Sequence, residues 1–226
     1  MDIKEIVKSL ERSTAAYRDI QPYSPHTCNT LIDGVSAAVQ CFLRRDNDTL
    51  WIVFRGTDSL MGWVSNLTFC QKTIPYGNSE SSIRVHTGFL NSYKTPDVRD
   101  KILESITDNT NYVKITGHSR GAALAILCAV DIQYNFPNRD IEVVLFGSPR
   151  VGNKAFVQSY NKRVDKTVRV ENSNDIVTKL PLALMDYRHV GAKLHVGGLR
   201  LPLCFSPDDH RPHKYYSALI TAMLGS

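Results

Sequence analysis

Apolar residues recur along this chain with two different spacings. Ile3, Ile6, Val7 and Leu10 are three or four residues apart, as on one face of a helix, so residues 2–18 are predicted to form an amphipathic helix. Further on, short runs rich in Val, Ile, Leu and Phe predict strands. These runs cover residues 35–43, 50–54, 112–116, 142–146 and 168–170. The first two are joined by a polar turn, which indicates an antiparallel hairpin.

Helical stretches separate the later strands. One is expected from Val85 to about Thr107 with a break near Pro96, and others follow residue 119, cover 152–162 and end the chain at 215–224. Strands that alternate with helices indicate an α/β fold, with a mostly parallel central sheet and helices on both faces. No linker-like segment divides the 226 residues, so we expect a single domain over 1–226.

The segment Gly-His-Ser-Arg-Gly at 117–121 lies between a predicted strand and a predicted helix. This G-x-S-x-G pattern is typical of a nucleophile elbow, in which a strained turn presents the hydroxyl of Ser119. Gly117 and Gly121 are expected because a Cβ at either position would crowd the neighbouring strand and helix. The helix that begins here directs backbone N–H groups toward the site, where they can hold an oxyanion.

A serine nucleophile needs a histidine base and a carboxylate that orients it. Asp175 follows the end of a predicted strand, as this chemistry requires, although a turn-forming aspartate is the alternative interpretation. For the base, His210 and His213 both lie in a Pro-rich loop before the last helix. His189 and His195 fall in strand-like patterns and are expected to serve packing or hydrogen bonding. His118, adjacent to the serine, is on the wrong side of the elbow to be its base.

Composition narrows the function classes. The chain is 42% apolar and 22% charged with a net charge of +5, and its basic residues are scattered, so nucleic-acid binding is not expected. The N-terminus lacks the apolar core of a signal peptide, and no apolar run approaches the length of a membrane span. Five cysteines without paired spacing argue against a metal site or disulfide framework, and Cys128 is expected in the core. An intracellular, cytoplasmic location is the resulting expectation.

Several motifs together resemble the class 3 lipases, the fungal-lipase-like branch of the α/β-hydrolases. They are Phe54–Thr57, the elbow, Val85–Tyr93, Phe146–Asn153 and Asn174–Val177. The resemblance covers about residues 14–224 and implies that Thr57 and the backbone N–H of Arg120 hold the oxyanion. It implies Asp175 as the triad carboxylate and favours His210 over His213 as the base.

Two further features follow from the resemblance. Asp58–Val64 matches the family's short lid, in which Trp63 would face substrate or membrane; a core plug is the other interpretation of this tryptophan. Arg120 departs from the family, which usually has leucine or another neutral residue there. An arginine in the first helical turn opposes the helix dipole, so either a salt bridge compensates it or it attracts an anionic group of the substrate.

The resemblance implies a carboxylic-ester hydrolase for acyl lipids that works through a Ser119–Asp175–His210 triad and an acyl-enzyme. A phospholipase A or an esterase for soluble esters is the alternative among enzymes, and an inactive lipid-binding scaffold is the alternative of another class. The reaction needs no metal and no cofactor. The expected partners are an acyl-lipid substrate and, transiently, a lipid surface, with no nucleic acid and no obligate protein partner.

Overall fold

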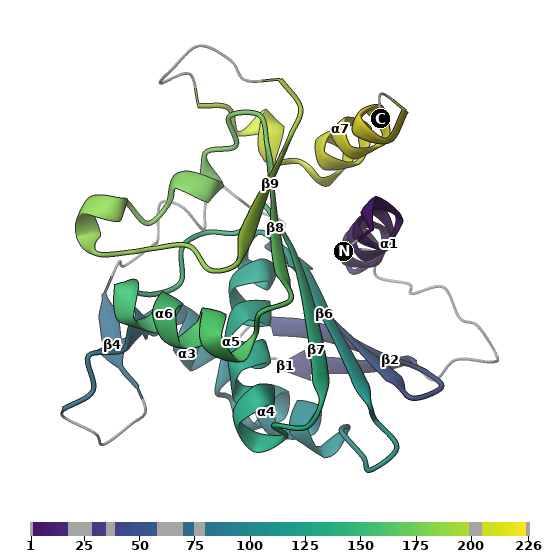
Figure 1. The fold of residues 1–226 in the computed structure, drawn as a ribbon, viewed down its shortest axis with the longest axis vertical. Helices are drawn as coiled ribbons and strands as arrows, with labels where there is room; N and C mark the ends of the chain where they lie inside the picture. The colour runs from purple at the N-terminus through teal and green to yellow at the C-terminus, as the bar shows by residue number, and fades with distance from the viewer. Residues whose placement is uncertain are drawn as a thin grey trace.

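The computed structural model describes residues 2–17, 29–34, 39–57, 70–74, 80–198 and 205–224. Its central element is a seven-stranded sheet in the order β1-β2-β3-β6-β7-β8-β9 (Figure 1). The strands are β1 (Asn29–Gly34), β2 (Val39–Asp46), β3 (Thr49–Phe54), β6 (Tyr112–His118), β7 (Asp140–Phe146), β8 (Thr167–Asn172) and β9 (Ala192–Val196). A separate two-stranded ribbon pairs β4 (Gln71–Thr73) with β5 (Arg84–His86).

The pairing mode changes once across the sheet, from antiparallel to parallel at β3. β1, β2 and β3 pair antiparallel, whereas β3, β6, β7, β8 and β9 pair parallel. The predicted hairpin is confirmed, because Cys41 of β2 pairs with Phe54 of β3. The predicted mostly parallel sheet is confirmed as well. Since parallel strands end at the same edge, the loops after β3, β6, β7 and β8 gather there.

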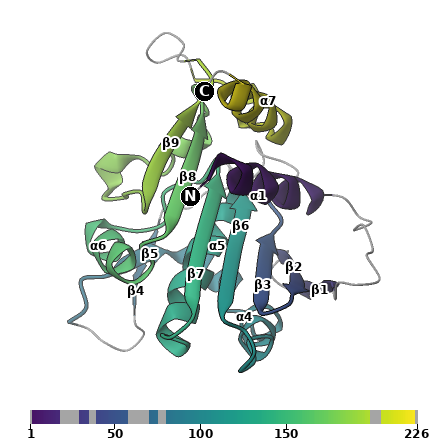
Figure 2. The same ribbon diagram turned by 45° about the vertical axis from the view of Figure 1, so that its right-hand side comes forward.

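Helices cover both faces of the sheet, as predicted. The helices are α1 (Ile3–Ala15), α3 (Thr87–Tyr93), α4 (Pro96–Glu104), α5 (Arg120–Asn135), α6 (Lys154–Arg163) and α7 (Pro212–Leu224). α1 and α7 lie side by side on one face, and α3 to α6 lie on the other (Figures 1 and 2). The break expected near Pro96 is present: α3 ends at Tyr93, and Pro96 opens α4, where its missing N–H costs nothing.

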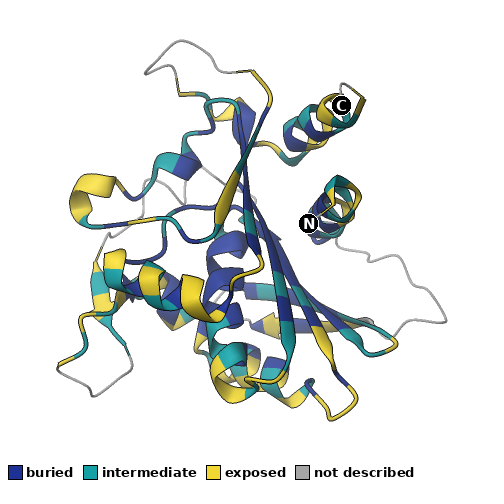
Figure 3. Cartoon of the chain, viewed as in Figure 1, coloured by how far each residue is buried: buried dark blue, intermediate teal, exposed yellow. Residues whose placement is uncertain are grey.

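Each face of the sheet has its own apolar core (Figure 3). The larger core packs α5 against β3, β6 and β7; its members include Ile52, Ile115 and Leu124, each at most 1% exposed. The smaller core lies under α1 and α7, where Leu10 and Leu219 meet Phe146. Cys128 lies in the larger core, as expected. α5 is apolar around most of its circumference because sheet and helices enclose it.

The sequence pattern missed three strands. β1 had not been expected, and neither had the ribbon of β4 and β5. All three are short or polar: β4 is Gln-Lys-Thr and β5 is Arg-Val-His, without the apolar run that marks a buried strand.

Candidate active site

Ser119 occupies the sharp turn between β6 and α5. Its φ of +59° lies in a region that non-glycine residues rarely adopt, as expected of a strained elbow. A Cβ at Gly117 would lie 2.5 Å from the backbone of Gly121, and one at Gly121 would lie 2.5 Å from the Phe54 carbonyl oxygen. Both glycines are therefore required by the close approach of strand and helix, as the sequence predicted. The Ser119 N–H donates to the Phe146 carbonyl at 2.9 Å, which ties the elbow to the end of β7.

Asp175 and His210 form a buried hydrogen-bonded pair. Nδ1 of His210 lies 2.8 Å from Oδ2 of Asp175, and the residues are 4% and 1% exposed. The hydroxyl of Tyr215 donates to the same Oδ2 at 2.6 Å, and the Val177 N–H donates to Oδ1 at 2.8 Å. Burial opposes the charge of Asp175, but the hydrogen bonds from His210, Tyr215 and Val177 outweigh it and hold its pKa below the usual value. A carboxylate can only accept, so Nδ1 of His210 carries a proton and Nε2 is left as a base.

Gly147 brings this pair beside the serine. It follows β7 with φ of +55°, and a Cβ there would lie 2.7 Å from Cε1 of His210 and 2.9 Å from Oδ2 of Asp175. The preceding residue, Phe146, accepts the Ser119 N–H. Ser119 and His210 thus flank one strand end, with Nε2 of His210 buried and without a hydrogen-bond partner among the described residues. The sequence signal for this contact was the Gly-Ser-Pro turn after a buried strand.

His118 joins the elbow to the loop of His210. Its Nε2 lies 2.7 Å from the His210 carbonyl oxygen, and its Nδ1 lies 2.7 Å from the hydroxyl of Tyr17, at the end of α1. Burial, with repulsion from His210 second, lowers the pKa of His118 to about 3. The ring is therefore neutral at pH 7: Nε2–H donates to the carbonyl, and Nδ1 accepts from Tyr17. These partners occupy both ring nitrogens of His118, in line with the expectation that it is not the base of Ser119.

Two groups are placed to hold an oxyanion. Thr57 follows β3 in the loop whose preceding residues pack against Gly121, and its Oγ1 is buried without a hydrogen-bond partner among the described residues. Arg120 is the first residue of α5, so its N–H lies at the positive end of the helix, outside the helical ladder. The Arg120 side chain donates a hydrogen bond of 2.8 Å to the hydroxyl of Ser92 on α3. Burial lowers the pKa of this guanidinium.

The other histidines lie in different environments. His213 is exposed on the first turn of α7, whereas His210 is buried against Asp175. His189 contacts the Thr178 carbonyl oxygen at 2.8 Å, and His86 accepts the N–H groups of Gly88 and Phe89 at the start of α3. His189 thus serves hydrogen bonding, as expected.

Several sequence predictions lie outside the described residues. These include Trp63 and the whole segment Asp58–Val64; two of the five cysteines, Cys28 and Cys204, lie outside them too. In the described part of the chain, no three His, Cys, Asp or Glu side chains are grouped as metal ligands would be. Within the same residues, no helix is both long enough and apolar enough to cross a bilayer.

Known proteins are similar to this chain over segments much longer than the site itself. Residues 51–185 match the family described as Lipase (class 3). A lipase from Rhizomucor miehei is 34% identical over 174 residues, which are 73% of this chain and 46% of the relative. The chloroplastic phospholipase A(1) DAD1 of Arabidopsis thaliana is 36% identical over 154 residues, which are 61% of this chain and 34% of the relative. The chain thus spans between about a third and a half of these curated relatives.

The similarity to solved structures covers a larger share of this chain than the similarity to the curated relatives does. The Rhizomucor miehei lipase in its propeptide complex superposes with a TM-score of 0.75 at 26% identity, over 86% of this chain and 68% of the other. A triacylglycerol lipase described as having a serine protease triad superposes with a TM-score of 0.77 at 26% identity, over 92% of both chains. The predicted α/β-hydrolase fold is thereby confirmed.

Proposed function

We propose that this chain, which belongs to the class 3 lipase family, hydrolyses carboxylic esters of acyl lipids through a triad of Ser119, His210 and Asp175. One observation carries the proposal. A serine held at φ of +59° in a strand–turn–helix elbow flanks the same strand end as a histidine that a buried aspartate orients. This arrangement supplies a nucleophile, a base and an orienting carboxylate in the roles that acyl transfer needs.

The reaction proceeds in two half-reactions. Nε2 of His210 takes the proton of Ser119 while Oγ attacks the ester carbonyl carbon, and the carbonyl π electrons move to the oxygen. The Thr57 hydroxyl and the Arg120 N–H donate to this oxyanion, each contributing on the order of 3–4 kcal/mol in comparable sites. The oxyanion collapses, the C–O bond breaks, and the alcohol leaves with the proton from His210. Water, deprotonated by His210, then attacks the acyl-enzyme and releases the fatty acid.

Asp175 and Tyr215 support the base. The carboxylate fixes the His210 tautomer and stabilises the imidazolium that forms when Ser119 loses its proton. Tyr215 donates to the same carboxylate oxygen as His210, so it helps keep Asp175 ionised inside the fold. Burial and the charge of Asp175 raise the pKa of Tyr215 well above its usual value, so this hydroxyl keeps its proton and remains a donor.

The test is hydrolysis of a lipid panel by the parent and three variants. Ser119→Ala and His210→Ala should each lose activity by at least about 1,000-fold, because members of a triad act as a unit. His213→Ala is the matched control and should retain the parent rate, because its side chain is exposed on α7. Full turnover by Ser119→Ala would refute the mechanism. A reversed result, with His213→Ala inactive and His210→Ala active, would move the base to His213.

A phospholipase A1 is the second candidate. The observation that favours it is the 36% identity to a protein named phospholipase A(1). The panel should therefore contain a triacylglycerol, a diacylglycerol and a phosphatidylcholine of one acyl composition. The substrate with the highest kcat/KM decides between the two, and labelling of Ser119 by a serine-reactive alkylphosphonate separates both from a non-catalytic scaffold.

Contact with a lipid surface is part of the proposal. A short-chain ester assayed below and above its micelle concentration tests it, because an enzyme that works at interfaces should accelerate when micelles form. A rate that follows simple saturation across that concentration would favour a soluble-ester esterase instead. Trp63 is expected to take part in the surface contact, and Trp63→Ala should reduce the acceleration without changing hydrolysis of the monomeric ester.

A further inference from the structure

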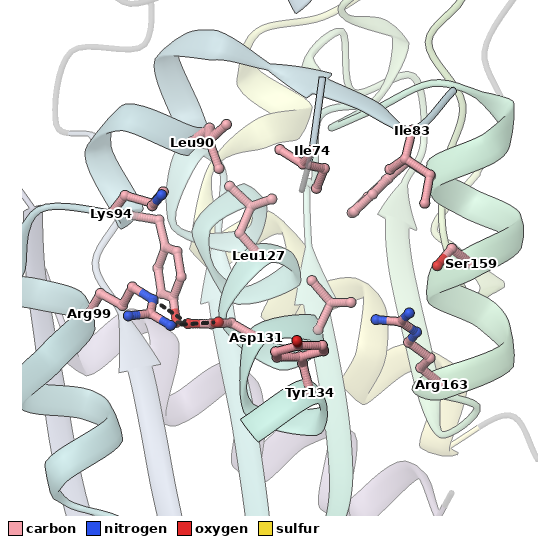
Figure 4. Close-up of a pocket in the computed structure, with 13 residues that line it drawn as sticks. Ile74, Ile83, Leu90, Lys94, Arg99, Leu127, Asp131, Tyr134, Ser159 and Arg163 are labelled. Carbon is pink, nitrogen blue, oxygen red and sulfur yellow. Dashed lines mark hydrogen bonds and ion pairs between the residues drawn. The ribbon is translucent and has the colours of Figure 1, made fainter. Parts of the chain in front are cut away.

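A cavity lies against the C-terminal half of α5, away from the elbow. It has a volume of about 410 Å³ and is bounded by α3 to α6 and by Ile74 and Ile83 beside the β4–β5 ribbon (Figure 4). The α5 residues that reach it are Leu127, Val130, Asp131 and Tyr134. At about 1.5 Å per residue, they lie roughly 12–22 Å beyond Ser119 along the helix axis. The cavity is therefore separate from the catalytic site.

The walls of this cavity are mainly apolar. Leu90, Leu127, Phe156 and Ile83 are among the apolar side chains that line it. Protein interiors pack with few voids larger than one water molecule, whereas small-molecule sites span about 300–1,000 Å³. The size and lining of this cavity match the second class. An alkyl chain is the kind of ligand that gains most from such walls, at about 0.8 kcal/mol per buried methylene.

One wall is polar, and its two charged side chains, Arg99 and Asp131, form an ion pair with each other. The Arg99 guanidinium donates two parallel hydrogen bonds, of 2.8 and 3.0 Å, to the Asp131 carboxylate. The Tyr93 hydroxyl donates to the same carboxylate at 2.9 Å. The planar fork matches the carboxylate geometry, so this pair is a fixed part of the wall. The positive charge of Arg99 is thereby offset by Asp131, so this pair offers little attraction for a further anion.

The remaining charges of the lining are positive. Among the described residues, the lining holds two arginines and one lysine against one aspartate, so the formal charge of these residues is +2. Lys94 lies on the Arg99 side, where burial, followed by repulsion from Arg99, lowers its pKa. Arg163 lies on the opposite side, on α6, four residues after Ser159, so both side chains share one helix face at the cavity (Figure 4). Within the described residues, Arg163 has no carboxylate within ion-pair distance.

We propose that this cavity binds one long-chain fatty acid. The carboxylate accepts hydrogen bonds from the Arg163 guanidinium and the Ser159 hydroxyl, and the alkyl chain lies along Leu127 and Phe156. Charge complementarity selects this ligand: apolar walls favour a chain, and an arginine without an acidic partner in the described part of the chain favours an anionic end. The proposal does not require Ser119 to be reactive, so it can fail or succeed independently of the proposed catalysis.

The experiment measures oleate binding by the full chain carrying Ser119→Ala, by calorimetry below the micelle concentration. One oleate per chain is expected. Arg163→Glu should weaken binding at least 10-fold, because it reverses the charge that meets the carboxylate. Lys162→Glu makes the same charge change at the adjacent exposed position, which does not line the cavity, and should alter the affinity less than 2-fold. Oleyl alcohol, which has the same chain and no charge, should bind at least 10-fold more weakly than oleate.

A volume-filling variant tests the position of the chain. Val130→Phe should abolish binding by occupying the cavity, with the melting temperature reported as a check on folding. Arg163 is exposed, so Arg163→Glu is expected to fold. It therefore tests oleate binding in the cavity even where Val130→Phe does not fold. Equal affinities of Arg163→Glu and Lys162→Glu would overturn the proposal, and so would oleate binding that a folded Val130→Phe leaves unchanged. Either result would place the bound oleate elsewhere, such as beside position 119 at the proposed catalytic site.

Discussion

The imidazole Nε2 of His118 lies 2.7 Å from the backbone carbonyl oxygen of His210, and the two rings are 4.4 Å apart at their centroids. The residue that precedes the proposed nucleophile thus holds the main chain of the proposed base. Tyr17 completes the contact from the other side through Nδ1 of His118. Three segments that are far apart in sequence, α1, the elbow and the loop before α7, meet in this one ring.

His118→Phe should lower kcat about 10-fold or more while KM changes little, because the ring volume is kept but the His210 loop loses its hydrogen-bond donor. His118→Gln offers an N–H near the position of Nε2 and should recover part of the loss. Steady-state kinetics on a soluble ester would measure both. A loss of kcat that is the same for Phe and Gln would show that His118 acts only through packing.

Thr57→Val should lower kcat by about 100- to 1,000-fold, because valine keeps the shape and removes the hydroxyl proposed to donate to the oxyanion. Thr57→Ser keeps a hydroxyl and should stay within about 10-fold of the parent. The comparison is made on kcat at saturating ester. A Val variant as fast as the Ser variant would exclude the side chain from the oxyanion hole.

Gly147→Ala should impair both activity and stability. Its Cβ would lie 2.7 Å from the His210 ring, and φ of +55° costs an alanine about 1–2 kcal/mol. We expect a kcat loss above 10-fold together with a lower melting temperature. Gly198→Ala is the matched control, because no atom of the described residues lies within 4 Å of the Cβ it would add. If Gly147→Ala is as active as that control, the close approach of His210 to this strand end is not needed.

Acid should destabilise the fold before the carboxylates titrate. Burial, with repulsion from Arg169 second, lowers the pKa of His189 to about 3, and His118 has the same shift. Both rings are neutral when folded, but in the unfolded chain they bind protons below about pH 6.5. The free energy of unfolding should therefore fall from pH 6.5 to 4.5, at most by about 1.4 kcal/mol per pH unit for each ring.

Urea unfolding at several pH values would measure this dependence. His189→Gln should flatten it, because glutamine can still donate to the Thr178 carbonyl but does not titrate. His213→Gln, at an exposed position, should leave the slope unchanged. Equal slopes for the parent and His189→Gln would show that protonation of His189 does not contribute to the loss of stability in acid.

Arg120→Leu tests whether the side chain after the nucleophile selects substrate charge. If Arg120 attracts an anionic headgroup, the variant should hydrolyse phosphatidylglycerol less well relative to phosphatidylcholine, with the change in kcat/KM confined to the anionic lipid. Its backbone N–H is retained, so hydrolysis of a neutral ester should persist. An unchanged ratio would restrict the guanidinium to structural contacts such as that with Ser92.

Local patterns accounted for most of the architecture. α1, the β2–β3 hairpin, the break before Pro96 and the strand–elbow–helix unit are each encoded within about 20 residues, so periodicity and turn residues were enough. β1, β4 and β5 were missed, because each is short or polar and lacks the apolar run that marks a buried strand, although β1 pairs with the neighbouring β2 and β4 pairs with β5.

The candidate site also has some features that local sequence predicts and others that it does not. The elbow and the strand-end positions of Thr57 and Asp175 follow from local sequence. The choice between His210 and His213 does not, because it depends on which ring reaches a carboxylate 35 residues earlier in the chain. The contact of His118 with the His210 backbone spans 92 residues and leaves no mark on the local pattern. Packing alone determines such contacts.

The two ends of the parallel strands differ in what they carry. The carboxyl ends of β3, β6, β7 and β8 carry the proposed chemistry, whereas the Asn47–Asp48 turn before β3 and the stretch 136–139 before β7 lie at the opposite edge. Attachment through that edge, by an engineered cysteine or an inserted tag, would fix the protein to a solid support with its reactive edge outward. The fold thus provides a defined orientation for display against a lipid layer.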